Sequence, residues 1–238
     1  MFVLGVFSAL FLWTISSAQG SSQEADLSHF IKWFISSHAA QIGESEQLIF
    51  ATNSDTSSSI STIHAVERKD SDWHLVFPSF TGSIGEKGFA AMGDKREGDG
   101  KSPSGVFPLG TAFGYELSVD TKFPYRQATD DDCWVDDANS DDYNQWVKGK
   151  PNAGSWEKMK RDDGQYIYGV VIEYNMHPIV KGKGSAIFLH VWQDGEPTHG
   201  CVAMPKEMVL RILEWLDPAK KPRIIMGTEP ELRTITFP

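Results

Sequence analysis

The chain has 238 residues, a formal net charge of −10 at pH 7 and a hydrophobic content of 40%. This length and apolar content suffice for one domain of ordinary to large size with a substantial core. The acidic excess argues against nucleic acid and against an anionic membrane surface as partners. We therefore expect one globular domain that binds neither of them.

Residues 1–18 predict a secretory signal peptide, because an apolar run of about 12 residues ends in small residues suited to cleavage. The run is shorter than the roughly 20 residues of a membrane helix. Cleavage falls after Ala18 or extends to Gly20. No Lys or Arg precedes the run, so an uncleaved anchor is the alternative. We expect an exported protein of the periplasm or cell envelope, with no membrane span after cleavage.

Hydrophobic periodicity predicts two helices and a series of strands. An amphipathic helix is expected over 24–43, and it should pack on a domain that spans 47–227. A second helix is expected over 205–216, where a proline and an acid stand in the first turn. Residues 152–164 predict a polar loop with a helical turn at 156–160. Strands are expected at 48–52, 60–67, 73–77, 165–174, 186–189 and 222–226.

A glycine-rich span covers residues 81–105 and has the composition of a phosphate-binding loop. It lacks the Gly-Lys-Ser/Thr ending after four spacer residues, and no helical pattern follows it. A nucleotide site is therefore not favoured. The end of the span, with Pro103 and Gly105, instead predicts a turn that leads into a core strand through Phe107.

Seven aspartates lie between Asp130 and Asp142, with aromatic residues and Cys133 among them. A calcium loop needs a central glycine and a closing glutamate at set positions, and this segment has neither. Two interpretations stay open. The segment is a solvated acidic loop, or it is a lid beside a groove, with aromatic side chains for contact and carboxylates for an ammonium group.

The stretch from His190 to Cys201 carries the residues best suited to chemistry. A short apolar strand leads to His190, and a polar turn returns the chain to Thr198-His-Gly-Cys201. This return brings the imidazole beside the thiol, which needs a base to act as a nucleophile. Gly200 permits the close approach of an acyl group, and the nearby N–H groups form a candidate oxyanion hole.

Three other roles for Cys201 compete with catalysis. It is an inert buried thiol, it forms a disulfide with Cys133, or it holds a metal together with His190 and His199. The disulfide is a serious alternative because an exported protein meets an oxidising compartment.

A histidine, a spacer and then Ser/Thr-His-Gly-Cys is the signature of the L,D-transpeptidase (YkuD-like) family, and the stretch from His190 to Cys201 resembles it. The resemblance covers roughly residues 47–226. It implies a mainly β fold with flanking helices (α+β), built as a β-sandwich with a helix after the cysteine. It also implies that the catalytic residues are Cys201, His190, His199 and Gly200.

The residues themselves indicate acyl transfer, in which His190 accepts the thiol proton of Cys201, and the resemblance implies the substrate. A thioester would form on Cys201 from a peptidoglycan stem tetrapeptide and pass to an amine acceptor, with no cofactor and no metal. A backbone carbonyl such as that of Val191 would orient the imidazole of His190, while His199 would assist the oxyanion or a leaving amine. Substrate contacts are expected from Trp134, Asp136, Asp137, Tyr143, Trp192 and Thr198.

Two features depart from the family pattern. The spacer between His190 and Thr198 has seven residues, fewer than usual, and Ala203 stands where many members have arginine. Both departures affect which acceptor is used and how the substrate is bound. Neither removes the nucleophile. The alternatives are a hydrolase with the same dyad, either an L,D-carboxypeptidase or an amidase, and a non-catalytic wall-binding module.

Overall fold

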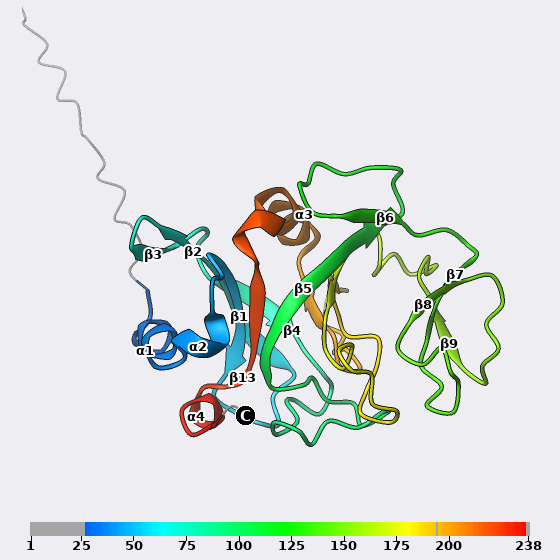
Figure 1. Cartoon of the computed structure of the whole chain (residues 1–238), viewed down its shortest axis with the longest axis horizontal. Coiled ribbons are helices and arrows are strands. Elements are labelled where there is room, and N and C mark those ends of the chain that lie inside the picture. Colours follow the sequence, from blue (N-terminus) through cyan, green and yellow to red (C-terminus); the bar gives the residue numbers. More distant parts are fainter. Residues whose placement is uncertain (1–26, 194, 237–238) are drawn as a thin grey trace, which may run out of the picture.

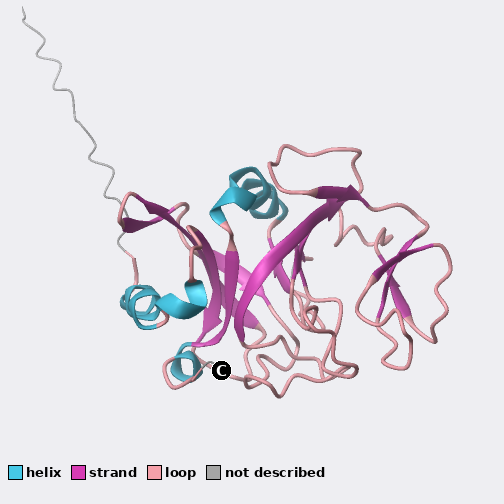
Figure 2. Cartoon of the chain, viewed as in Figure 1, coloured by secondary structure: helices cyan, strands magenta, loops and turns pink. Residues whose placement is uncertain are grey.

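Strands dominate the protein, whose computed structural model describes residues 27–193 and 195–236. Figure 1 shows one large sheet with helices at its outside and a small separate sheet beside it, and Figure 2 shows how much of the rest is loop. The mainly β fold with few helices that the sequence predicts is confirmed. The residues predicted as a signal peptide, 1–18, lie outside the described part of the chain.

The large sheet has ten strands. They are β1 (Gln47–Asn53), β2 (Ile60–Lys69), β3 (Asp72–Leu75), β4 (Phe80–Ser83), β5 (Gly105–Gly114), β6 (Tyr125–Gln127), β10 (Tyr168–Ile172), β11 (Phe188–Val191), β12 (Val202–Met204) and β13 (Arg223–Thr228). The small sheet contains β7 (Asp132–Val135), β8 (Trp146–Lys148) and β9 (Trp156–Lys158).

The large sheet closes on itself. Its strand order is β1-β13-β5-β10-β11-β12-β4-β2-β3, and β1 pairs with β2 as well as with β13. The two-sheet sandwich expected above is not confirmed, because these pairings give a barrel-like sheet. Hydrophobic alternation identifies a strand but says nothing of which edges pair, and the closure depends on both edges of β1.

Helices pack on both faces of this sheet. Two clusters of apolar side chains lie on opposite faces of β1, because successive residues of a strand point to opposite sides. Ile49 and Ala51 pack in the main core with α3 (Lys206–Trp215), whereas Leu48 and Phe50 pack with α1 (His29–Ser37). The helices are α1 (His29–Ser37), α2 (Ala39–Ile42), α3 (Lys206–Trp215), α4 (Glu229–Leu232) and the short 3-10 helix η1 (Pro218–Lys220).

The small sheet covers another part of the outer face. Val171 on β10 and Phe188 on β11 point away from the main core and pack with Trp134 of β7. The acidic segment is therefore not only a loop, since it carries β7 and leads into β8. The helical turn expected at 156–160 is wrong: β9 runs through Trp156–Lys158 and pairs with β7.

No helix among residues 27–193 and 195–236 is long and apolar enough to cross a membrane. Within the range 24–43, the described residues form α1 and α2, which are divided at His38.

Replacing Phe34 with alanine should lower the free energy of unfolding by about 3–5 kcal/mol. Phe34 is fully buried, and its ring meets that of Phe50 on β1 edge-on at 5.7 Å between centroids. The exposed Ser37→Ala control on the same helix should change the unfolding free energy by less than about 0.5 kcal/mol. Urea denaturation measures both. Equal effects of the two changes would show that α1 does not pack on the sheet.

Candidate active site

The pairing of β11 with β12 brings together the two ends of the predicted catalytic stretch. The two strands are parallel, with Leu189 opposite Val202 and His190 opposite Ala203. His190 lies on the same face of β11 as Phe188, so it points outward toward the small sheet and not into the main core. Cys201, the residue before β12, packs on that face too.

The turn that precedes Cys201 is held by Thr198. Its hydroxyl accepts a hydrogen bond from the Gly200 N–H at 3.1 Å and donates one to the Cys201 carbonyl at 2.8 Å. Thr198 is itself buried. The Gly200 N–H is thus engaged within the turn and is not free for an oxyanion.

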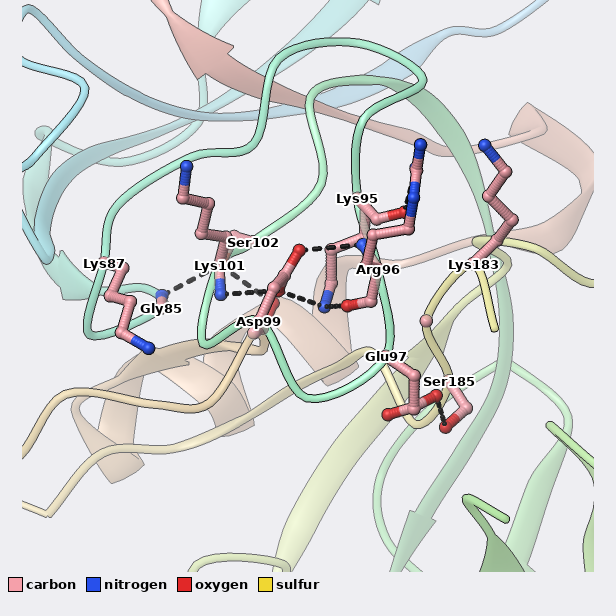
Figure 3. Close-up of polar contacts among 12 residues, drawn as sticks. Gly85, Lys87, Lys95, Arg96, Glu97, Asp99, Lys101, Ser102, Lys183 and Ser185 are labelled. Atoms are coloured by element: carbon pink, nitrogen blue, oxygen red, sulfur yellow. Dashed lines mark hydrogen bonds and ion pairs between the residues drawn. The ribbon is translucent and has the colours of Figure 1, made fainter. Parts of the chain in front are cut away.

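Gly200 allows the turn to lie close to the preceding glycine-rich loop. Its φ of +151° lies in a region that favours glycine, and a Cβ here would stand 2.9 Å from the Lys101 carbonyl oxygen. The Ser102 hydroxyl joins the two segments by donating to the Gly200 carbonyl at 2.8 Å. It also accepts from the Gly85 N–H at 2.9 Å within the glycine-rich loop (Figure 3).

A buried ion pair fixes the glycine-rich loop beside the thiol. The Lys95 ammonium lies 2.7 Å from an Asp99 carboxylate oxygen and donates to the Arg96 carbonyl at 2.8 Å, as Figure 3 shows. The positive charge of Lys95 lowers the pKa of the Cys201 thiol, although this effect is smaller than that of burial.

The Cys201 thiol is buried among backbone groups. It donates to the Ala186 carbonyl at 3.2 Å and accepts from the Phe188 N–H at 3.3 Å. Burial raises the pKa of the thiol to about 12, and the nearby Glu157 carboxylate acts in the same direction. The thiol is therefore protonated in the free protein at neutral pH.

The His190 imidazole is oriented by a backbone carbonyl. Its Nδ1 donates to the Val191 oxygen at 2.8 Å, which confirms the prediction that this carbonyl orients the ring. Since Nδ1 carries the proton, Nε2 is the basic nitrogen. Burial lowers the pKa of His190 to about 4, so the ring is neutral at neutral pH.

One cavity of about 410 Å³ contains both side chains in its wall. No hydrogen bond joins His190 to Cys201, two residues that the structure describes, and catalytic hydrogen bonds often tighten only when substrate binds. Tyr166 lies against both residues. Its ring stands 5.1 Å from that of His190 and packs in one cluster with Cys201, and its side chain lowers the pKa of the Cys201 thiol against the larger effect of burial.

The Tyr166 hydroxyl donates to the Oε2 of Glu157 at 2.6 Å. Glu157 comes from β9 and lies in the cavity wall. The Arg161 guanidinium, 5.2 Å from the centre of the Tyr166 ring, is paired with Asp163. The small sheet thus contributes a carboxyl group to the surroundings of the thiol.

The structure brings together only part of the predicted site. Cys201, His190, His199 and Gly200 all line the cavity, and so do Asp136 and Thr198. His199 is exposed there. The other four predicted substrate contacts lie outside its wall.

Trp134 and Tyr143 are buried. The indole N–H of Trp134 donates to Asn144, and the Tyr143 hydroxyl donates to Glu97. Asp137 accepts from the Gly154 N–H, and the Trp192 indole donates to the carbonyl of Glu196. Their assignment as substrate contacts stays a prediction.

Four residues of the site do not follow from the sequence: Glu157, Tyr166, Lys95 and Ser102. Tyr166 stands in an aromatic, β-branched stretch that is typical of a core strand. Glu157 stands in a polar segment without a clear pattern. The proline and glycine around Ser102 do predict the turn that leads into β5, which begins at Gly105.

Both cysteines are free, so the predicted alternative of a Cys133–Cys201 disulfide is wrong for this structure. Among the described residues, no cluster of three or more His, Cys, Asp or Glu side chains is arranged to hold a metal ion.

The family model of the L,D-transpeptidase catalytic domain (YkuD) matches residues 75–226, well over half of the chain. The chain belongs to this family. The matched range includes the cavity residues from Glu86 to Cys201, and the resemblance inferred from the Thr198-His-Gly-Cys201 motif is therefore confirmed. No curated protein matches the chain.

A solved structure, the helical cell shape determining protein Pgp2 from Campylobacter jejuni, matches 84% of this chain at 17% identity with a TM-score of 0.37. The chain spans 56% of that protein's length.

Cys201 should react with iodoacetamide slowly at pH 7 and faster as the pH rises, because its raised pKa leaves little thiolate at neutral pH. Rates measured on a Cys133→Ser variant belong to Cys201 alone. The denatured wild-type protein should show two free thiols by mass spectrometry. A Cys133–Cys201 peptide in a non-reduced digest, or an alkylation rate independent of pH, would contradict this.

Gly200→Ala should lower the free energy of unfolding by about 3 kcal/mol, the sum of an unfavourable φ and a clash with the Lys101 carbonyl. Gly149→Ala is the matched control, because Gly149 has a φ of +81° and open space around its Cβ position. This control should cost only about 1–2 kcal/mol. If the two variants have the same denaturation midpoint, the close approach of Gly200 to the Lys101 carbonyl does not restrict which residue can stand at position 200.

Proposed function

We propose that this protein is an exported cysteine acyltransferase of the cell envelope. It would form a thioester on Cys201 from a peptidoglycan stem tetrapeptide and transfer the acyl group to an amine, thereby cross-linking or remodelling the wall. The observation that carries the proposal is that the Cys201 thiol and the His190 imidazole lie in the wall of one cavity, with Nε2 left as the base. Membership of the family supports it.

The acylation step follows from these positions. The Cys201 proton passes to Nε2 of His190 while the sulfur attacks the carbonyl carbon before the terminal D-alanine. The Cys201 N–H stabilises the oxyanion. The imidazolium then gives its proton to the leaving nitrogen, the C–N bond breaks, and D-alanine departs. Because both groups are neutral at rest, the proton moves as the bond forms and not before.

The charge of the cavity supports an amine as the acceptor. Five carboxylates stand in its wall, while the cations Lys95 and Arg161 are each paired with an aspartate. An ammonium group is therefore attracted more strongly than an anion. The carboxylates are Glu86, Glu97, Asp136, Glu157 and Glu196.

Purified protein incubated with disaccharide-tetrapeptide should release D-alanine and form dimers that are cross-linked between stems. Cys201→Ala should remove both products. His190→Ala should slow them by about 10²–10⁴-fold, because it removes a general base. His199→Ala should reduce turnover only in part, since this exposed ring would assist without accepting the thiol proton.

Liquid chromatography with mass spectrometry identifies the products. Acyl-enzyme formation in the Cys201→Ala variant would end the hypothesis. Tripeptide as sole product would indicate an L,D-carboxypeptidase, cleavage elsewhere in the wall an amidase, and no product at all a wall-binding module.

A further inference from the structure

Glu157 has a position that the acylation step does not use. Its Oε2 accepts from the Tyr166 hydroxyl at 2.6 Å, and Tyr166 packs in one cluster with Cys201. Glu157, Tyr166 and Cys201 all line the same cavity, so the carboxyl of Glu157 lies near the sulfur on which the acyl group would reside. The other carboxyl oxygen, Oε1, has no hydrogen bond to another described residue, and the residue lines the cavity.

The second half of the proposed reaction needs a base at this place. An acceptor amine of the lysine type has a pKa of about 10.4 and arrives as an ammonium ion, which cannot attack a thioester. The base must lie in the cavity beside the sulfur and must not be committed to another cation. Of the other carboxylates in the cavity wall, Glu86 lies 3.8 Å from the Lys87 ammonium, and Glu97 accepts from the hydroxyls of Tyr143 and Ser185. Glu157 is the one that accepts from Tyr166, whose ring lies against His190.

We propose that Glu157 is the catalytic base that binds the acceptor ammonium and deprotonates it for attack on the Cys201 thioester. This inference rests on the proposed acyl transfer. A proton moves from the ammonium nitrogen to Oε1 of Glu157, and the neutral amine attacks the thioester carbonyl. The C–N bond forms and the C–S bond breaks. The second proton lost by the nitrogen returns to the sulfur through Nε2 of His190, and Glu157 releases its proton to water.

The surroundings of Glu157 suit this role. Burial raises the pKa of its carboxyl above the ordinary value, which makes the carboxylate a stronger base. The groups that face it are Tyr166, Arg161, Asp136 and His199. Arg161 and His199 partly offset the increase. Asp136 adds to it, and its Oδ1 is buried without a hydrogen-bond partner among the described residues.

Glu157→Gln tests the proposal, because the amide oxygen can still accept from Tyr166 while the basic oxygen is gone. Two rates are measured: the release of the first equivalent of D-alanine, which reports acylation, and the transfer of the acyl group to a stem-peptide amine. Acylation should stay within about twofold, whereas transfer to the amine should fall by about 10²-fold or more.

Hydroxylamine provides a matched acceptor, since it is mostly uncharged at pH 7 and needs no prior deprotonation. Its transfer rate should be unchanged in Glu157→Gln. Glu157→Asp, which keeps a carboxylate, should recover part of the transfer to the stem-peptide amine. Glu116→Gln removes an exposed carboxylate outside the cavity and should alter none of these rates.

Each remaining outcome overturns the assignment. A parallel loss of acylation, amine transfer and hydroxylamine transfer would show that Glu157 only holds Tyr166 in place. Unchanged amine transfer would show that another group deprotonates the acceptor. If Glu157→Gln fails to fold, Glu157→Asp replaces it, and an equal slowing of amine transfer and hydroxylamine transfer in that variant would exclude Glu157 as the base. Failure of the wild-type protein to form any acyl-enzyme would refute the proposed function itself, which the D-alanine measurement detects separately.

Discussion

The parallel pairing of β11 with β12 is the constraint on which the site depends. It places His190 opposite Ala203, and it places Cys201 directly before the first residue of β12. A parallel pair needs a connection that crosses back, and here the polar turn from Trp192 to Gly200 supplies it. This turn must pass close to the glycine-rich loop, so Gly200 and the Ser102 hydroxyl are needed where they meet.

The small sheet packs on this framework through Trp134 and Phe188, and two sets of polar contacts join it to the surroundings of the thiol. The Asn144 side chain accepts from the Trp134 indole and from the Ala186 N–H, and the carbonyl of Ala186 accepts from Cys201. Glu157 accepts from Tyr166, which packs with Cys201. The acidic segment therefore shapes the site from outside the barrel. The part of it that lines the cavity is Asp136, while Asp137 binds its own loop.

The sequence predicts the local features and misses those that depend on distant pairing. The strand at Leu48 and the helix after Cys201 follow from short patterns. The Val191 carbonyl is expected because no Asp, Asn or Glu is an obvious partner for His190. The structure has the strand, the helix and this carbonyl contact. The closure of the barrel does not follow from the sequence, because the alternation of apolar and polar residues does not determine which strands pair. The sequence also does not predict the role of Asp132, which is one of the seven aspartates between Asp130 and Asp142. Although burial opposes ionisation, hydrogen bonds from Thr129 and Trp146 lower the pKa of this carboxyl to about 2, so it holds the small sheet together.

Burial shifts the pKa values of the nucleophile and of the base in opposite directions, and both shifts favour the neutral forms. It raises the pKa of Cys201 to about 12 and lowers that of His190 to about 4, so the thiolate–imidazolium pair is disfavoured before substrate enters. A dry site of this kind protects the thiol from oxidation, since only the thiolate reacts readily. The exclusion of water also strengthens each hydrogen bond that is donated to a developing oxyanion. Activation therefore has to come with the substrate, whose carbonyl accepts the charge that the buried thiol cannot hold alone.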